Sequence, residues 1–253
     1  MPYILALFFL GVVQGLTEFL PVSSSGHLVL FSKIFGIEES LFVSIILHVA
    51  TLLSIIVVFR KDIWQMIRHP FSKETIQIVV ATIPTCLIVL VLMPLIKKSF
   101  VGNFLPLCFA ISAVILFVAE VLSKKKSEKE FDLKSAFLMG IAQGFAVFPG
   151  ISRSGATISA GLMAGRNKKD VAKFSFVMSI PIVLLSLIME IYEICSGILV
   201  VNVGFWPLLL SFVVAFLVGI FSIKIMIKLT SKANLKWFSA YLILISIFSL
   251  FLM

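Results

Sequence analysis

The sequence predicts an all-α polytopic membrane protein, an inverted-topology repeat with six transmembrane helices and two re-entrant helical hairpins. Three observations support this fold class. First, 60% of the 253 residues are hydrophobic and the mean hydropathy is +1.17, which is more apolar surface than a soluble domain could bury. Second, the basic residues gather in loops between apolar stretches. Third, two polar islands in the apolar sequence repeat each other. We therefore treat residues 1–253 as a single integral membrane domain.

The two polar islands align without a gap when the sequence is shifted by 129 residues. Seven of sixteen positions are then identical: Gly11, Gln14, Gly15, Phe19, Ser23, Ser25 and Gly26 match Gly140, Gln143, Gly144, Phe148, Ser152, Ser154 and Gly155. The islands differ where Glu18 faces Val147, Ser24 faces Arg153 and His27 faces Ala156. One copy holds an acid and an imidazole, and the other holds a cation. This pattern divides the chain into repeat one (1–122), a basic cytoplasmic linker (123–134) and an inverted repeat two (135–253).

The first repeat is expected to open with a re-entrant hairpin. Its first apolar stretch, residues 3–20, runs into Pro21 and a serine-rich turn, and apolar residues resume only at 28–31. Neither arm is long enough for a hydrocarbon core about 30 Å thick, and irregular backbone at that depth must be buried in protein or line a wet cavity. Residues 60–75 are expected to form a basic loop. Three full spans are predicted in this repeat, at residues 41–59, 76–96 and 104–122.

The second repeat has the same order of elements. Residues 136–149 and 154–165 predict a second broken hairpin, around a turn at 150–153. The fourth, fifth and sixth full spans are predicted at residues 171–190, 205–223 and 237–253. Each repeat therefore contains one hairpin and three full spans. Because three is an odd number, the second repeat must be inverted relative to the first.

The basic residues orient the chain. Four stretches, residues 60–75, 123–134, 166–173 and 224–236, hold four, five, four and four of the 21 Lys and Arg. Placing these seventeen on the cytoplasmic side follows the positive-inside rule and puts both termini outside. The hairpins then enter from opposite sides, and their tips are expected to meet near the membrane midplane. The same distribution assigns the net charge of +9 to membrane topology, so nucleic acid is not an expected partner.

The residues of the two islands are those of a phosphoryl-transfer site. The second arm of each hairpin begins after a serine-rich turn, and a helix N-terminus there offers unpaired N–H groups to an anion. The guanidinium of Arg153 can hold two phosphate oxygens. Ser24 and His27 lie three residues apart and share a helix face. Glu18 precedes them, with Gln14 one turn earlier, so that a nucleophile, an acid or base, a carboxylate and a cation are all present.

We expect four catalytic residues, Glu18, Ser24, His27 and Arg153. Ser24 is the predicted nucleophile, and His27 is expected to accept or donate the proton. Glu18 is expected to polarise the group that takes the proton or to hold a cation. Direct attack by His27 or by water stays open as an alternative. The predicted substrate-binding residues are Gln14, Ser23, Ser25, Gly26, Ser152, Ser154, Gly155 and Thr157.

At these residues the chain resembles the undecaprenyl pyrophosphate phosphatases of the bacitracin-resistance type. The first motif of that family, Glu or Gln, three residues and Glu, is matched by Gln14 and Glu18, and its serine-rich turn ending in Gly-His is matched by residues 23–27. The second motif, Pro-Gly-x-Ser-Arg-Ser-x-x-Thr, is matched throughout by residues 149–157. The resemblance extends over nearly the whole chain.

The resemblance implies an enzyme that removes the terminal phosphate of a polyprenyl diphosphate, with its site open to the outer side of a bacterial plasma membrane. This activity recycles the lipid carrier for cell-wall synthesis and gives bacitracin resistance. The family is assisted by divalent cations, so Mg²⁺ or Ca²⁺ is the expected cofactor, with Glu18 as its ligand. Gln14 stands where many members have Glu, which leaves one carboxylate. Membrane lipids and a second copy of the chain, in a homodimer, are further expected partners.

Two other functions share some of these sequence features. Type-2 phosphatidic acid phosphatases also use Ser-Gly-His and Ser-Arg, but they require a histidine six residues after the arginine, where this chain has Ser159. The main rival is a transporter or flippase for polyprenyl phosphate or a small anion, because broken helices in inverted repeats also suit alternating access. The different side chains of the two islands favour the enzyme.

Overall fold

The computed structural model describes residues 2–37, 41–99, 104–123, 130–196, 203–232 and 234–252. The regular elements of these ranges are helices, as the sequence predicts. Their bounds are α1 Tyr3–Thr17, α2 Ser24–Phe35, α3 Leu41–Val58, α4 Arg60–Arg68, α5 Lys73–Ser99, α6 Leu105–Ser123, α7 Leu133–Phe145, α8 Arg153–Met163, α9 Lys168–Cys195, α10 Phe205–Lys232 and α11 Lys236–Leu252. The predicted linker falls partly outside the description, since residues 124–129 are not included.

Four helices, α5, α6, α9 and α10, are long and apolar enough to cross a membrane. A fifth span is present if α3 and α4 count together, although the two are bent by 78° at Phe59. The apolar helices α1 and α11 are shorter, at 15 and 17 residues. The described part of the chain is thus a multi-pass membrane protein with four or five helices of spanning length.

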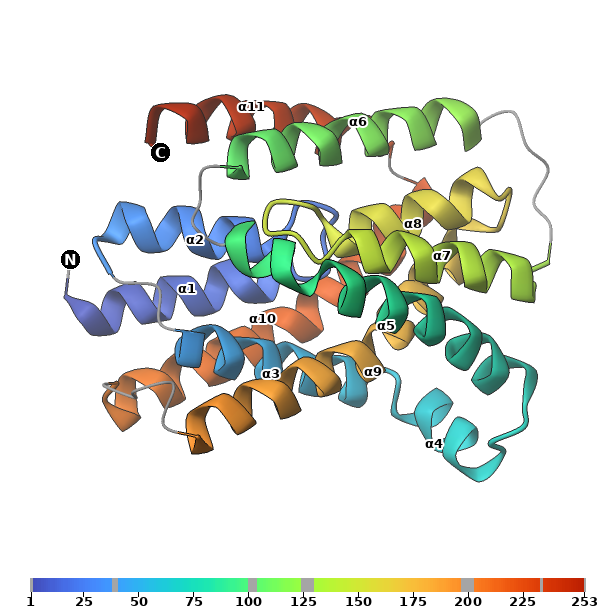
Figure 1. The fold of residues 1–253 in the computed structure, drawn as a ribbon, viewed down its shortest axis with the longest axis horizontal. Coiled ribbons are helices and arrows are strands. Elements are labelled where there is room, and N and C mark those ends of the chain that lie inside the picture. The colour runs from blue at the N-terminus through green and yellow to red at the C-terminus, as the bar shows by residue number, and fades with distance from the viewer. Residues whose placement is uncertain are drawn as a thin grey trace.

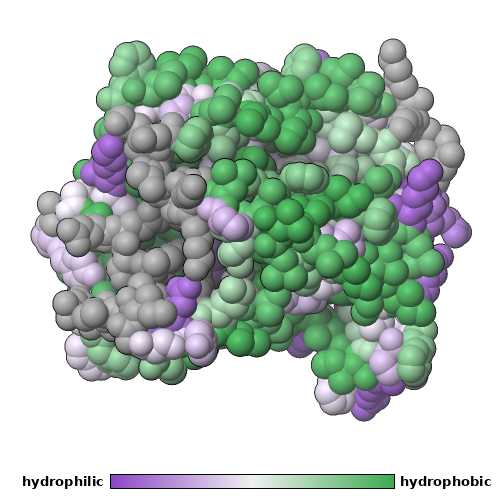
Figure 2. All heavy atoms as spheres, viewed as in Figure 1, coloured by the Kyte–Doolittle hydropathy of each residue, from purple (hydrophilic) through white to green (hydrophobic). Residues whose placement is uncertain are grey.

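Apolar side chains cover the outside of these helices. On α5 the exposed residues include Val79, Ile83, Leu87, Leu90 and Val91. Figure 2 shows this hydrophobic surface across the middle of one face, with hydrophilic side chains toward its left and right ends. In water such a surface would be costly, at about 25 cal/mol for each Å². A belt between two polar ends is the pattern expected of a protein surrounded by lipid.

The helices form two opposed hairpins surrounded by longer helices (Figure 1). Helices α1 and α2 lie on the left of that view and α7 and α8 on the right, and the two turns face each other at the centre. Helix α1 packs on α10, and α7 packs on α5. Helices α6 and α11 lie side by side along the top. Each hairpin is therefore held by a long helix of the other half of the chain.

Two glycines that are equivalent in the sequence repeat allow this packing. A Cβ atom added at Gly11 of α1 would lie 2.5 Å from the carbonyl oxygen of Ser211 on α10. A Cβ added at Gly140 of α7 would collide in the same way with the carbonyl of Ala81 on α5. Any larger residue would push the backbones apart, so these repeated glycines serve close helix–helix approach.

The prediction of a loop over residues 60–75 is wrong for its first part, which forms α4. The charges of this stretch lie among apolar residues at helical spacing, and Ile63 and Met66 turn toward the core while Trp64 and Ile67 are exposed. The first turn contains Asp62 and the last contains Arg68, which matches the helix dipole. The loop was predicted from the charges alone, whereas the helical spacing of the apolar residues indicates an amphipathic helix.

Candidate active site

The first polar turn connects α1 to α2 and buries a carboxylate. Helix α1 ends at Thr17, and the Pro21 that follows has no N–H with which to continue a helix. Glu18 lies in this turn with only 6% of its surface exposed. Its Oε2 accepts hydrogen bonds from Ser24 Oγ at 2.6 Å and from Gln14 Nε2 at 3.0 Å. The carboxylate is thus in direct contact with the hydroxyl predicted to be the nucleophile.

Ser23 gives this turn an uncommon backbone conformation. Its φ is +70°, the only positive φ at a non-glycine residue in the described part of the chain. Such a residue costs about 1–3 kcal/mol and persists only where its surroundings hold it. Ser23 is also the N-cap of α2, and its Oγ accepts from the Gly26 N–H at 3.4 Å. Helix α2 therefore begins at Ser24, directly after a strained residue.

The second polar turn connects α7 to α8. Gly150 has a φ of +91°, and a Cβ there would lie 2.6 Å from Cys108 Cβ, so only glycine fits. Ser152 is the N-cap of α8 and accepts from the Gly155 N–H at 3.0 Å. Ser112 of α6 holds the backbone on both sides, because its Oγ donates to the Gly150 carbonyl at 3.1 Å and accepts from the Ser152 N–H at 2.9 Å.

The two turns touch each other. Arg153 Nη2 forms an ion pair with Glu18 Oε1 across the interface. Ser154 Oγ donates to the carbonyl oxygen of Leu20 at 2.9 Å. A Cβ at Gly26 would lie 2.9 Å from Gly150 Cα, so the backbones themselves are close. Three of the residues that differ between the islands, Glu18, Ser24 and Arg153, are in this way brought into one site.

A cavity of about 210 Å³ opens beside this contact. Seven of the predicted site residues line it: Glu18, Ser23, Ser24, Ser25, Ser152, Arg153 and Ser154. An apolar wall from α3 and α9 completes it, with Ile45, Val49, Ile182, Val183 and Leu187. Arg153 Nη1 is a buried donor with no hydrogen-bond partner in the described residues. One guanidinium thus holds Glu18 with one nitrogen and keeps another for a ligand.

Five predicted residues lie outside this lining: Gln14, Gly26, His27, Gly155 and Thr157. Gln14 still contacts the site through Glu18. Thr157 is buried, with its hydroxyl 2.6 Å from that of Ser175 on α9. His27 is 1% exposed, and both ring nitrogens are engaged, Nδ1 at 2.7 Å from the Ser23 carbonyl and Nε2 at 2.8 Å from the Tyr241 hydroxyl.

The structure adds His48 of α3 to the site. Its Nε2 lies 3.7 Å from Glu18 Oε2, and its Nδ1 lies 2.8 Å from the Ser44 carbonyl. In the sequence, Ser44, His48 and Thr51 are spaced so that they share one face of the helix. Ser44 and His48 line the cavity, and Thr51 Oγ1 accepts from Gln14 at 3.4 Å. Sequence reasoning did not single out Tyr241.

The donors around Glu18 do not by themselves build a divalent-cation site. No group of three His, Cys, Asp or Glu side chains in the described residues is placed to hold a metal ion. The neighbouring oxygen of Gln14, Oε1, is buried and has no hydrogen-bond partner among the described residues, but it is neutral. Hard cations require six or more oxygen ligands. A cation at Glu18 would need phosphate and water oxygens for the rest of its coordination.

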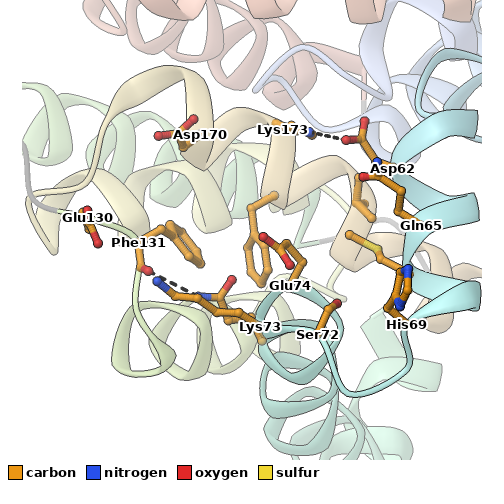
Figure 3. A pocket seen from close by; sticks show the side chains of 14 residues that line it. Asp62, Gln65, His69, Ser72, Lys73, Glu74, Glu130, Phe131, Asp170 and Lys173 are labelled. Atoms are coloured by element: carbon orange, nitrogen blue, oxygen red, sulfur yellow. Dashed lines mark hydrogen bonds and ion pairs between the residues drawn. The ribbon is translucent and has the colours of Figure 1, made fainter.

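A second cavity, of about 570 Å³, is larger but has the wrong charge for phosphate. It lies between α4, α5 and α9, where Lys173 bonds Asp62 at 2.6 Å (Figure 3). Four carboxylates line it, Asp62, Glu74, Glu130 and Asp170, against two lysines, Lys73 and Lys173. A diphosphate would be repelled there. The smaller cavity at Arg153 is the better phosphate site because of its chemistry, not its size.

Comparison with known proteins identifies the family of this chain. The family described as bacitracin resistance protein BacA matches residues 7–248. The undecaprenyl-diphosphatase of Carboxydothermus hydrogenoformans is 40% identical over 236 residues, which cover 92% of this chain and 90% of that protein. The undecaprenyl-diphosphatase of Thermosipho melanesiensis is 38% identical over 247 residues, covering 95% and 96%. With a match that spans nearly its whole length, this chain belongs to the BacA family of bacitracin resistance proteins.

Proposed function

We propose that this chain is an undecaprenyl-diphosphatase, which hydrolyses undecaprenyl diphosphate to the monophosphate and inorganic phosphate. In this role it recycles the lipid carrier of cell-wall synthesis and gives resistance to bacitracin. The observation that carries the proposal is the meeting of Arg153 from one hairpin with Glu18 and Ser24 from the other, in a buried cavity. The curated relatives that cover nearly the whole chain bear the same activity in their names.

The cavity suits a lipid diphosphate at both of its ends. Its polar end offers the free Nη1 of Arg153 and the N-termini of α2 and α8, where unpaired N–H groups attract phosphate oxygens. Its apolar wall comes from α3 and α9. In our proposal the terminal phosphate lies at Arg153 and Ser24, and the prenyl chain follows the apolar wall toward the lipid. Specificity for a lipid then comes from burial of hydrocarbon.

Ser24 is the proposed nucleophile. Its hydroxyl already donates to Glu18 at 2.6 Å, so Glu18 takes the proton as Oγ attacks the terminal phosphorus. The phosphoanhydride bond breaks, and the lipid monophosphate leaves with the bonding electron pair. Arg153 stabilises the negative charge on the phosphoryl oxygens. The leaving monophosphate takes the proton from Glu18, which is then free to act again. A water molecule attacks the phosphoserine and gives its proton to Glu18, and Glu18 passes that proton to Ser24 Oγ as inorganic phosphate is released.

We further propose that the two halves are inverted repeats, with six spans and two re-entrant hairpins. The exchanged packing supports this, since α1 lies on α10 as its counterpart α7 lies on α5. The 17 residues of α11 reach about 25 Å at 1.5 Å for each residue, close to the core thickness. The positive-inside rule orients α4 toward the cytoplasmic face. Since the cavity wall comes from the halves of α3 and α9 that lie away from that face, we propose that the site opens to the outer side of a bacterial plasma membrane.

Phosphate release by purified protein in detergent tests the function. Without two compartments transport is impossible, so release of inorganic phosphate from undecaprenyl diphosphate supports the enzyme. Binding of substrate with no release would favour the flippase. Rapid acid quench with labelled substrate tests the nucleophile. A phosphoserine at residue 24 is expected, whereas an acid-labile phosphohistidine would implicate His27. If Ser24→Ala retains a substantial rate and nothing is trapped, water is the attacking group.

A further inference from the structure

We propose that Tyr241 is a positioning residue for Ser24, and that it acts through His27, which serves as a fixed hydrogen-bond link and not as a proton carrier. The inference rests on the proposed function, in which Ser24 is the nucleophile. It replaces the role that the sequence suggested for His27. Four observations support it: the hydrogen bonds of the imidazole, its isolation from the cavity, the backbone of Ser23, and the position of Tyr241 in the sequence repeat.

The hydrogen bonds assign one tautomer to His27. Nδ1 lies 2.7 Å from the carbonyl oxygen of Ser23, which can only accept, so Nδ1 carries the hydrogen. Nε2 is then an acceptor, and the Tyr241 hydroxyl at 2.8 Å donates to it. The Tyr241 ring is stacked on the imidazole, with centroids 5.7 Å apart and planes 8° apart. Both nitrogens are occupied, and the ring is held in one orientation.

His27 is also separated from the reacting groups. It is 1% exposed and is not among the residues that line the cavity. The rings of Phe109 and Phe31 pack against it, with centroids 5.4 and 6.5 Å away. The Ser24 hydroxyl bonds Glu18 instead, at 2.6 Å. A proton leaving Ser24 therefore has Glu18 as its acceptor, and His27 is not needed to receive it.

The point at which His27 acts is the strained residue before the nucleophile. The Ser23 carbonyl accepts two hydrogen bonds from His27, one from the ring Nδ1 and one from the backbone N–H at 3.2 Å. A φ of +70° at Ser23 is maintained only if contacts hold it. The direction of this carbonyl fixes the peptide plane between residues 23 and 24, and with it the start of α2. Tyr241 and His27 together thus determine where the Ser24 hydroxyl points.

The sequence repeat gives an independent argument. A shift of 129 residues, which aligns the two islands, also brings Ser112 of α6 onto Tyr241 of α11. Ser112 holds the second turn directly, by its bonds to Gly150 and Ser152. Tyr241 holds the first turn through His27. Equivalent positions of the two repeats therefore support the turn of the opposite hairpin, each with a different side chain.

This correspondence also explains why the imidazole is present in one island only. The counterpart of His27 is Ala156, in the turn that Ser112 reaches without an intermediary. At the first turn the supporting group is the Tyr241 hydroxyl, which bonds the His27 imidazole and not the backbone. His27 then completes the link to the Ser23 carbonyl. The asymmetry that suggested divided catalysis is, for this residue, a difference in how the backbone is held.

Replacing the imidazole by an amide distinguishes a hydrogen-bond donor at position 27 from a proton carrier. The side-chain nitrogen of His27→Asn can occupy the place of Nδ1 and donate to the Ser23 carbonyl, but it cannot carry a proton in catalysis. We expect His27→Asn to stay within about 10-fold of the wild-type kcat, a loss typical of one hydrogen bond. His27→Ala, which has no donor, is expected to fall by about 100-fold or more. Equal loss in the Asn and Ala variants would overturn the proposal.

Tyr241→Phe tests the same link from its other end. The change removes one hydroxyl and keeps the stacked ring, so the protein is expected to fold, with kcat about 10-fold lower and KM unchanged. In the His27→Asn background, where no Nε2 acceptor remains, the same change should alter kcat less than 2-fold, because the two residues act in one chain. Tyr192→Phe is the matched control, since Tyr192 is 70% exposed.

Two results at Tyr241 would contradict the proposal: a wild-type kcat for Tyr241→Phe, or fully additive losses in the double variant. If the His27 variants do not fold, the kcat of Tyr241→Phe alone decides. Phosphate release by the wild-type protein separates this inference from the function on which it rests. If the wild type is inactive, both fall. If it is active and the variants do not follow the expected pattern, only the positioning role falls.

Discussion

Arg153→Lys is the most direct test of how the site holds phosphate. The guanidinium has one nitrogen on Glu18 and a second, Nη1, that is buried and has no hydrogen-bond partner in the part of the chain that the structure describes. Lysine keeps the positive charge but has one nitrogen in place of the fork. It can neutralise Glu18 or bind the phosphoryl group, not both in the same geometry. Removal of one donor to a transition-state oxygen costs about 10²–10³-fold in kcat, and we expect a loss of that size.

Stability should change much less than activity. The charge beside Glu18 remains, so the folded state loses at most about one charge-assisted hydrogen bond, roughly 1.5–3 kcal/mol. Phosphate release in detergent gives kcat and KM, and a thermal melt of the same sample shows whether the variant folds. Arg60→Lys is the matched control, because Arg60 is exposed and its guanidinium donates to the backbone carbonyl of Val57 near the end of α3, away from the cavity. Near-normal turnover by a folded Arg153→Lys would show that Arg153 is structural.

Three further predictions concern the frame around the site. Gly140→Ala should lower the thermal stability by about 1–3 kcal/mol, because the added methyl meets the α5 backbone, and a wild-type melt would refute the close approach. In a cysteine-free background, an outside-facing thiol reagent should label Gly204→Cys and not Lys169→Cys in intact cells; the reverse would contradict the inverted topology. The pKa of Asp132 is lowered by hydrogen bonds from Ser135 and by Arg166. Its folded-state pKa is thus below its unfolded value, so its stabilisation is present above the unfolded pKa and is lost as pH falls through the folded one. Asp132→Asn should make the melt less acid-sensitive below about pH 4, and an unchanged acid dependence would count against that role.

The helices were predictable where a long apolar run is their cause. The predicted spans 41–59 and 104–122 correspond to α3 and α6 within a residue at each end. The prediction was wrong where charge was taken as a loop, since α4 forms over residues assigned to the basic stretch 60–75. After the fifth predicted span, the spacing of lysines four residues apart is typical of a helix end, and α10 does continue to Lys232.

The site was predictable as far as local sequence determines it. The serine-rich turns and Arg153 are recognisable from the sequence because polar and charged residues within membrane segments are energetically costly and are usually functional. The partners that come from distant helices could not be recognised in the sequence, since the hydrogen bond between His27 and Tyr241 joins residues 214 positions apart. His48 was recognisable only as part of a helix face. Which of two histidines faces the cavity is decided by tertiary packing, and single-sequence patterns carry no information on it.

The exchange of helices between the two halves explains why a single site arises from two similar islands. Each hairpin packs on a long helix of the opposite half, α1 on α10 and α7 on α5, so neither half can complete its fold alone. The turns are thereby forced together, and a residue of one island becomes part of the surroundings of the other. By the repeat alignment, two identical turns would set Glu18 against a serine or Arg153 against a valine and leave a charge without a partner, whereas Glu18 against Arg153 is an ion pair. The contact itself therefore favours divergence of the islands, and a carboxylate beside a hydroxyl, facing a cation, is the arrangement that phosphoryl transfer requires.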